Sequence, residues 1–455
     1  MSVLCKDADV VAVQWSEAER IKALMNVIPR GCVNAVLRET GHHNRRCTRL
    51  PRWFVVWFVV ALGLFCQDSY RQVFKWLQRF RRKSTPGRST LCEARHSLGP
   101  APLRLLAERV IELQGQPDTP HAFYAGMRLM AWDSFIVDVA DTPANERAFG
   151  RPGGGRSAGA FPQARVLSLC ELGTHVLWRS LIKPQHRGEP PMAHYLARFL
   201  EENMLLLGDR NFLSYGLVKR IRQRGAHLLV RLKSTAVFGV ERRLPDGSYL
   251  SKLYRSSSDR DYDRNGIRVR IIEYTFQDPG RSGSGERHRL VTTLLNAKEH
   301  PAKRLIVMYH ERWEEELTID ELKTHQRQRP VLRSETPGGV VQEIYGLLLG
   351  HFIIRKLMCE AAIQAEVAPR ELSFVETLKI LRCRLPECPR TVTGLKRWYQ
   401  NLLDEVSEAV LPPRRNRINP RVVKRKMKHW PKKREKHYEF PQPTKKFHSS
   451  IVMLN

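Results

Sequence analysis

The spacing of apolar positions predicts an N-terminal helical domain. Apolar residues recur at helical spacing up to about residue 82, and Ser16 can cap the first helix, which Pro29 ends. The run from Trp53 to Cys66 is apolar throughout, but it is shorter than the ~20 residues that cross a bilayer. We therefore expect a buried helix there and no membrane span. Residues 83–99 are polar and rich in turn formers, so a linker is expected, and domain plus linker should cover residues 1–120.

A strand-like alternation begins at Arg128 and continues, with helices between the strands, to residue 232. It predicts strands at 128–141, 164–170, 175–181, 204–207 and 226–232, and helices at 193–202 and 213–224. Short polar alternating segments over 233–290 indicate a β-rich insertion ahead of a further strand. This order predicts an α/β catalytic domain over residues 121–370, interrupted by the insertion at 233–290.

The last third of the chain is predicted to be helical and then strongly basic. A helix from Tyr309 to Lys323 precedes an apolar helix at 341–361, and a C-terminal helical region covers 371–411. In the tail over 412–455, the cations between 414 and 436 are opposed only by Glu435. Such a segment is not expected to fold alone, but it would be attracted to phosphates.

The charge balance makes nucleic acid the expected partner. Lys and Arg number 77 against 46 Asp and Glu, a net charge of +31, and this excess is stabilised by a polyanion. A basic ribosome-associated or membrane-surface protein is the alternative. Nine irregularly spaced cysteines argue against a disulfide framework and for a reducing cytosol. With no targeting segment evident, we expect the protein in the cytoplasm, where the DNA is.

Four residues of the predicted helix Tyr309–Lys323 suit a site that binds phosphate and metal. Tyr309, Arg312, Glu316 and Lys323 project within roughly 60° of one another if the helix is continuous. One carboxylate is then surrounded by a phenol and two cations. Glu316 could instead be one acid of a solvated face, and Asp320 shares its stripe.

Two further acids come from other predicted elements. Asp133 lies within a strand, and Asp209 ends an apolar strand in the sequence GDRNF. Together with Glu316 they could converge and hold Mg²⁺ or Mn²⁺ through carboxylate oxygens, with two ions serving the two sides of a phosphodiester. Each has an ordinary alternative, because a strand Asp is often an edge residue and Asp209 could cap the helix that follows.

These motifs resemble a known family, the DDE transposases of the insertion-sequence-four type. Tyr309-x2-Arg312-x3-Glu316-x6-Lys323 matches its Y-R-E-K signature. The segments DTPANERAFGRPGGGRSAGAFPQARV, GDRNF, LPRWFVVWFVVALGLF and LRSETPGGVVQEIYGLLLGHFIIRKLM are also similar to that family, in the same order, and the likeness runs from about Ile28 to Trp430. Two positions depart from it: Ser134 follows the first acid where relatives often have Gly, and Asn211 replaces a frequent Gly.

The resemblance implies an RNase H-like core with a β insertion and a DDE triad of Asp133, Asp209 and Glu316 on two Mg²⁺ ions, which Mn²⁺ could replace. Tyr309, Arg312 and Lys323 would hold DNA phosphates, and charge and position add Arg210.

The implied reaction is hydrolysis and strand transfer at terminal inverted repeats, by a dimer on double-stranded DNA at the bacterial nucleoid. The alternatives are a non-catalytic protein that occupies inverted repeats and a nuclease without strand transfer. The candidates for stacking on a displaced base are the insertion aromatics Tyr249, Tyr254, Tyr262, Tyr274 and Phe276.

Overall fold

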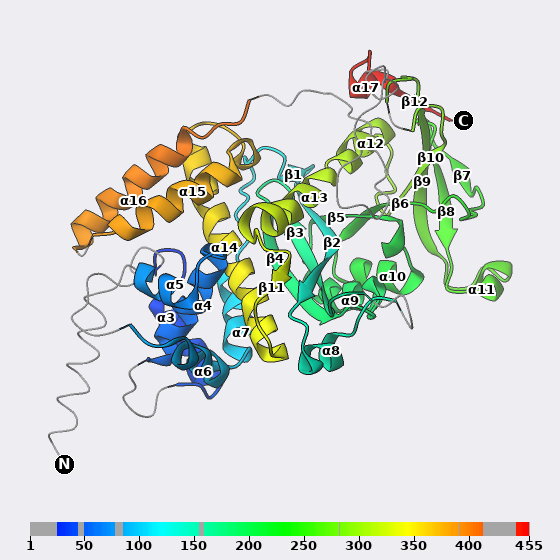
Figure 1. The fold of residues 1–455 in the computed structure, drawn as a ribbon. Coiled ribbons are helices and arrows are strands. Elements are labelled where there is room, and N and C mark those ends of the chain that lie inside the picture. The colour runs from blue at the N-terminus through cyan, green and yellow to red at the C-terminus, as the bar shows by residue number, and fades with distance from the viewer. Residues whose placement is uncertain are drawn as a thin grey trace, which may run out of the picture. The chain divides into compact units, whose positions relative to one another are not determined.

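The computed structural model describes residues 25–43, 50–77, 85–153, 159–281, 283–389, 391–412 and 443–454. The chain divides into two compact units (Figure 1). The first unit comprises Met1–Phe199 and Trp313–Leu411, and the second comprises Leu200–Arg312 and Pro412–Asn455. The helix predicted after Ser16 and most of the basic tail lie outside the described residues.

The N-terminal part of the first unit is helical, as predicted. Its helices are α3 (Arg30–Glu39), α4 (Arg52–Leu64), α5 (Tyr70–Leu77), α6 (Arg88–Leu98) and α7 (Ala101–Val110). The apolar run forms α4, and every residue of α4 from Trp53 to Leu64 is buried. Within the described residues no helix is long and apolar enough to span a membrane.

Helix α6 corrects the prediction of a linker over 83–99. The turn formers of that stretch lie at the ends of the helix: Gly87 is its N-cap, and Gly99 follows it with a φ of 65°. A positive φ favours glycine, so Gly99 ends α6 without strain. The turn-forming residues Gly87 and Gly99 therefore mark the two ends of α6 and not a linker.

A set of paired strands in the first unit carries the first candidate acid. Its long strand β2 (Met127–Val139) pairs antiparallel with β1 (Phe123–Tyr124) and β3 (Gln163–Glu171), and β3 pairs antiparallel with β4 (Val176–Pro184). The short strand β11 (Val331–Leu332) joins β2 in parallel. Helices α8 (Pro143–Phe149) and α9 (Glu189–Leu196) lie against β3 and β4, and α13 (Trp313–Asp320) lies against β2.

The long helix α14 (Pro337–Gln364) is the centre of the first unit. Thr336 caps it by accepting a hydrogen bond from the Gly339 amide. It crosses α4 so closely that a Cβ on Gly63 would lie 2.0 Å from the Gly346 carbonyl oxygen. Glycine is therefore required at this crossing. Helices α15 (Phe374–Arg384) and α16 (Val392–Ser407) pack on α14 as well.

The second unit is built on one mixed sheet. Strand β5 (Met204–Gly208) is parallel to β6 (His227–Arg231), and α10 (Tyr215–Gln223) connects the two. Antiparallel strands continue from β6 through β10 (His288–Thr292), β9 (Ile267–Phe276), β8 (Tyr249–Leu253) and β7 (Arg242–Arg243). The predicted β-rich insertion thus extends the same sheet. The short helix α11 (Ser257–Asp261) joins β8 to β9, and α12 (Ala302–His310) follows β10.

The C-terminal residues return to this sheet. After α17 (Phe447–Ser450), strand β12 (Ile451–Met453) pairs antiparallel with β9, placing Ile451 opposite Phe276. The Phe447 ring lies 4.4 Å from the His310 ring on α12. The end of the predicted basic tail is therefore an ordered part of the second unit.

Candidate active site

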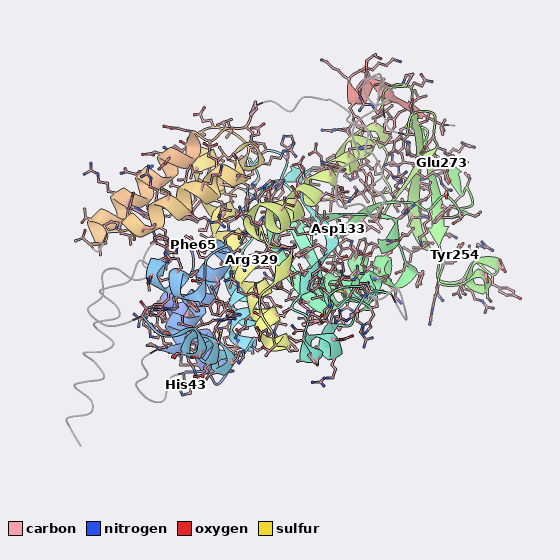
Figure 2. The ribbon with its side chains drawn as sticks, in the orientation of Figure 1. His43, Phe65, Asp133, Tyr254, Glu273 and Arg329 are labelled. Atoms are coloured by element: carbon pink, nitrogen blue, oxygen red, sulfur yellow. The ribbon has the colours of Figure 1, made fainter. Side chains whose placement is uncertain are left out.

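Asp133 lies in the middle of β2, where it is half-buried opposite Ser168 of β3 (Figure 2). Its Oδ1 accepts a hydrogen bond from the backbone amide of Ser134 at 2.7 Å. The strand register shows which face its side chain occupies. Ala131, two residues earlier on the same face, pairs with Cys170, and the Cys170 thiol lies 3.8 Å from the Thr318 hydroxyl on α13. Asp133 therefore projects from the face of the sheet that α13 covers.

Ser134, the departure from the family pattern, has a structural role on the opposite face. Its hydroxyl donates to Glu189 at 2.6 Å and accepts from Arg165 at 2.9 Å. Arg165 and Glu189 also pair with each other at 3.1 Å. Ser134 thus links β2 and β3 to the start of α9, on the face opposite the Asp133 side chain.

Asp209 follows β5 directly, at the edge where parallel strands commonly place ligands. It precedes the 3₁₀ turn Arg210–Phe212 and makes no side-chain capping bond to it. The cap of α10 is Ser214, which accepts from the Leu217 amide. The alternative of Asp209 as a helix cap is therefore wrong. Arg210 is exposed beside it.

Tyr309 and Arg312 lie next to Asp209 in the second unit. The Tyr309 hydroxyl donates to the Gly208 carbonyl at 3.3 Å, one residue before Asp209. Burial raises the pKa of Tyr309, with a contribution from Asp209, while the charge and hydrogen bond of Arg312 act to lower it. The signature phenol and guanidinium therefore share one neighbourhood with the second acid.

The prediction of one continuous helix from Tyr309 to Lys323 is wrong. Helix α12 ends at His310, and α13 begins at Trp313. Between them the amides of Glu311 and Arg312 bond three residues back, to Met308 and Tyr309, so the turn tightens. Three glutamates then occupy the first turn of α13, where the positive end of the helix dipole stabilises carboxylates. The four signature residues therefore do not lie on one face of a single helix, as was calculated for an unbroken one.

Glu316 and Lys323 lie in the first unit, Glu316 on α13 and Lys323 in a second irregularity that follows α13. Glu316 is half-buried, at the boundary between the buried and exposed faces of α13. Lys323 is half-buried within a π-helical segment, Glu321–Gln326. Such a segment makes i→i+5 hydrogen bonds and is frequent at functional sites.

The predicted residues therefore form two groups. Asp133, Glu316 and Lys323 belong to the first unit, whereas Asp209, Arg210, Tyr309 and Arg312 belong to the second. Among the described residues, no cluster of three or more His, Cys, Asp or Glu is arranged to hold a metal ion. The convergence of the three acids thus stays a prediction.

The insertion aromatics separate by burial. Tyr249, Tyr274 and Phe276 are buried, and the Tyr249 hydroxyl donates to Glu273 at 3.1 Å. Tyr262 is 68% exposed, and Tyr254 is half-buried with its hydroxyl on Asp263 (Figure 2). Tyr254 and Tyr262 are therefore the two of the five that lie outside the core.

Two features of the first unit were not identified from the sequence. One is a buried cluster behind α13, in which His175 contacts Glu314 and Glu321. The other is a cavity of about 410 Å³ whose basic lining suits a phosphate group. The basic residues lining it are Arg88, Arg95, His96, Arg329 and Arg333. The signal for both features is that charged side chains are buried, and the burial of a side chain cannot be predicted from composition alone.

Comparison with known proteins assigns the family. The profile "Insertion element 4 transposase N-terminal" matches residues 18–108, and "Transposase DDE domain" matches residues 124–353. Transposase InsG for insertion sequence element IS4 of Escherichia coli K12 is 28% identical over 454 residues, which cover 97% of this chain and 98% of InsG. Putative transposase InsZ of the same organism is 24% identical over 201 residues, 44% of this chain and 67% of InsZ.

One solved structure that the chain matches is the cryo-EM structure of the piggyBac transposase synaptic complex with hairpin DNA. Its TM-score is 0.41 at 10% identity, with 87% of this chain and 86% of that chain covered. The DDE-domain match, which spans more than half of the 455 residues, confirms the predicted mixed α/β, RNase H-like class. The chain belongs to the DDE transposases of the insertion-sequence-four type, DNA-binding enzymes that cleave DNA with divalent metals and carry out transposition.

Proposed function

We propose that Asp133, Asp209 and Glu316 are the catalytic carboxylates and that they hold two Mg²⁺ ions, which Mn²⁺ can replace. The observation that carries the proposal is the placement of Tyr309 and Arg312 against Asp209, in the spacing of the signature. The donor set fits hard cations because all three groups offer carboxylate oxygens. The metal ions would supply an activated water or 3′-hydroxyl and a stabilised leaving oxygen.

The cations around these acids are proposed to hold DNA. Arg312 would present its guanidinium to a phosphate, a geometry that guanidinium groups match with two parallel hydrogen bonds. Tyr309 would orient Arg312 through the hydrogen bond between their side chains, because the Tyr309 ring is buried and its hydroxyl donates to Gly208. Lys323 and the exposed Arg210 would add phosphate contacts. These residues position the strand to be cut and contribute no proton transfer.

We infer that the substrate is double-stranded DNA ending in the element's terminal inverted repeats, cut and then joined to target DNA by a dimer. The helices within residues 1–120 would recognise the repeats, an inference supported by the N-terminal family match over 18–108. The catalytic domain would cover 121–370 around the insertion at 233–290, followed by the helical region 371–411 and the basic tail 412–455. The enzyme would act at the nucleoid in the bacterial cytoplasm.

The first test replaces Glu316 with Gln, which keeps the size and removes the charge. Cleavage of inverted-repeat DNA in Mg²⁺ should fall by at least about 100-fold, because a ligand of the metal site is lost, and DNA affinity should stay within about twofold. Single-turnover cleavage on labelled ends and a mobility-shift titration measure the two quantities. Retained cleavage would exclude Glu316 as the third acid.

The matched control is Asp320→Asn on the same helix. Asp320 is exposed and pairs with Thr324 and His325, so its loss should leave cleavage unchanged. A strand-transfer assay with a pre-cleaved 3′ end then separates a transposase from a nuclease, and light scattering on the DNA complex reports the dimer. A wild-type protein that binds ends and never cuts them would favour the non-catalytic alternative.

A further inference from the structure

A cluster of charged side chains is buried behind the helix that carries Glu316. The His175 ring lies 3.1 Å from Glu314 and 3.0 Å from Glu321. Arg355 of α14 donates to Glu321 through Nε at 2.9 Å and again through Nη2, and it lies 2.7 Å from His175. His351 contacts the second Glu321 oxygen at 3.2 Å. Side chains from α14 and from the turn between β3 and β4 thus contact the single carboxylate of Glu321.

The cluster is buried and charged, which is costly unless its members hold one another. Arg355 and His351 are 1% and 0% exposed, and His175 is 2% exposed. Burial raises the pKa of Glu321, but the facing Arg355 and His175 outweigh it and bring the pKa below its usual range. His175 also has a φ of 59°, a strained conformation that persists only where its surroundings fix it. Replacing such a buried charged network with apolar side chains of similar volume is often neutral or stabilising, so a gain in stability does not by itself explain the cluster.

The cluster contacts α13 on the face opposite Glu316. Glu314 and Glu321, seven positions apart, both point at His175. On an α-helix Glu316 projects about 160° from Glu314. The π-helical segment that contains Lys323 is fixed at both ends, by Glu321 in the cluster and by Gln326. The Gln326 amide donates at 2.9 Å to the carbonyls of Gly63 on α4 and Leu347 on α14.

We propose that Glu321, with Arg355 and His175, is a positioning unit that sets the rotation of α13 and the path of the π-helical segment, and thereby aims Glu316 and Lys323 at the reacting phosphodiester. The proposal rests on the proposed role of Glu316. None of the three residues touches DNA or metal in it. They act through the helix, as groups behind a metal ligand orient that ligand.

The test is Glu321→Gln in the full-length protein, assayed on saturating inverted-repeat DNA. Cleavage per folded molecule in Mg²⁺ should fall about 10- to 100-fold, the usual loss when an orienting partner of a metal ligand is removed. The Mg²⁺ concentration for half-maximal cleavage should rise, while the Kd for DNA stays within about twofold. Mn²⁺ should restore more activity to the variant than to wild type, because Mg²⁺ demands near-ideal octahedral geometry.

Two further variants separate positioning from loss of stability. Glu321→Gln with Arg355→Met removes both charges and leaves no unpaired arginine, so it should fold and still show the raised Mg²⁺ requirement. Glu171→Gln is the matched control: Glu171 is fully buried and accepts hydrogen bonds from Arg128, from Thr174 and from the backbone amides of Gln114 and Gly115. It should lower the melting temperature but leave the Mg²⁺ titration unchanged.

The outcomes distinguish the two proposals. An active Glu316→Gln enzyme would remove the proposed catalytic acid itself. An inactive Glu316→Gln enzyme beside a Glu321→Gln enzyme with wild-type rate and Mg²⁺ titration would overturn the positioning unit alone. The same loss in Glu171→Gln at equal folded fraction would also overturn it, since the effect would then follow from any buried charge.

Discussion

At the scale of single residues, burial explains the state of the titratable groups better than their position in the sequence does. His310 ends α12 and packs against Phe276 and Phe447. Burial, with His288, Arg281, Arg231 and Arg312 nearby, lowers the pKa of His310 to about 4. The sequence offered no sign of this, because the partner Phe447 lies far along the chain. His310 is therefore neutral in the folded protein at pH 7.

The stability of the second unit should therefore depend on pH. In the unfolded chain His310 has a pKa near 6.5, so between about pH 6.5 and 4 the unfolded state binds a proton that the folded state excludes. Stability should be complete above pH 6.5 and decline by up to about 3 kcal/mol as the pH falls to 4.

His310→Leu should flatten this decline, measured as thermal midpoints between pH 7.5 and 4.5. The exposed His43→Gln is the control and should behave as wild type does (Figure 2). Equal slopes for His310→Leu and wild type would contradict the assignment.

At the scale of elements, the pattern predicted those that carry a strong apolar signal in their own sequence. The uniform apolar run gave α4, the alternation gave β2, and the apolar helix became α14. The break between α12 and α13 was not predictable, because Glu311 and Arg312 are good helix formers and no Gly or Pro marks it. The π-helical segment depends on contacts of Glu321 and Gln326 with distant helices, which spacing does not encode. The signature residues were thus found by spacing, although the geometry inferred from that spacing was wrong.

The crossing of α4 and α14 makes a prediction at this scale. Gly63→Ala would place a Cβ within 2.0 Å of a backbone carbonyl, which no rotamer relieves. The helices must separate, at a cost of about 1–3 kcal/mol or more. Gly31→Ala is the control, because nothing lies within 4 Å of its Cβ position in α3 and alanine favours a helix. The midpoint of thermal unfolding should be lower for Gly63→Ala than for wild type, and it should not be lowered in Gly31→Ala. Similar midpoints for the two variants would contradict the close crossing.

At the scale of the whole molecule, the excess of cations governs DNA binding. With a net charge of +31, affinity for any duplex should fall steeply with salt, because each phosphate contact releases counterions. The charge predicted the partner from composition alone. It did not predict the 410 Å³ cavity, because the basic residues that line this cavity come from two distant parts of the sequence.

Arg88→Ala, at the rim of that cavity, should weaken binding to all sequences alike and reduce the slope of log K against log salt by about 1. Fluorescence anisotropy between 50 and 300 mM NaCl measures the slope. Arg384→Ala is the control, since Arg384 pairs with Glu405 at 2.7 Å outside the cavity. A slope unchanged by Arg88→Ala would place the phosphate contacts elsewhere.

The pairing of β12 with β9 has a consequence for the order in which the chain folds during synthesis. Residues 451–453 leave the ribosome long after their partner residues 274–276. Until residues 447–453 have been synthesised, β9 lacks this neighbour and His310 lacks the Phe447 ring. The nascent chain can therefore complete its first unit before strand β12 of the second unit has been synthesised. Residues 451–453 therefore add their strand to the second unit only after every residue of the first unit has been synthesised.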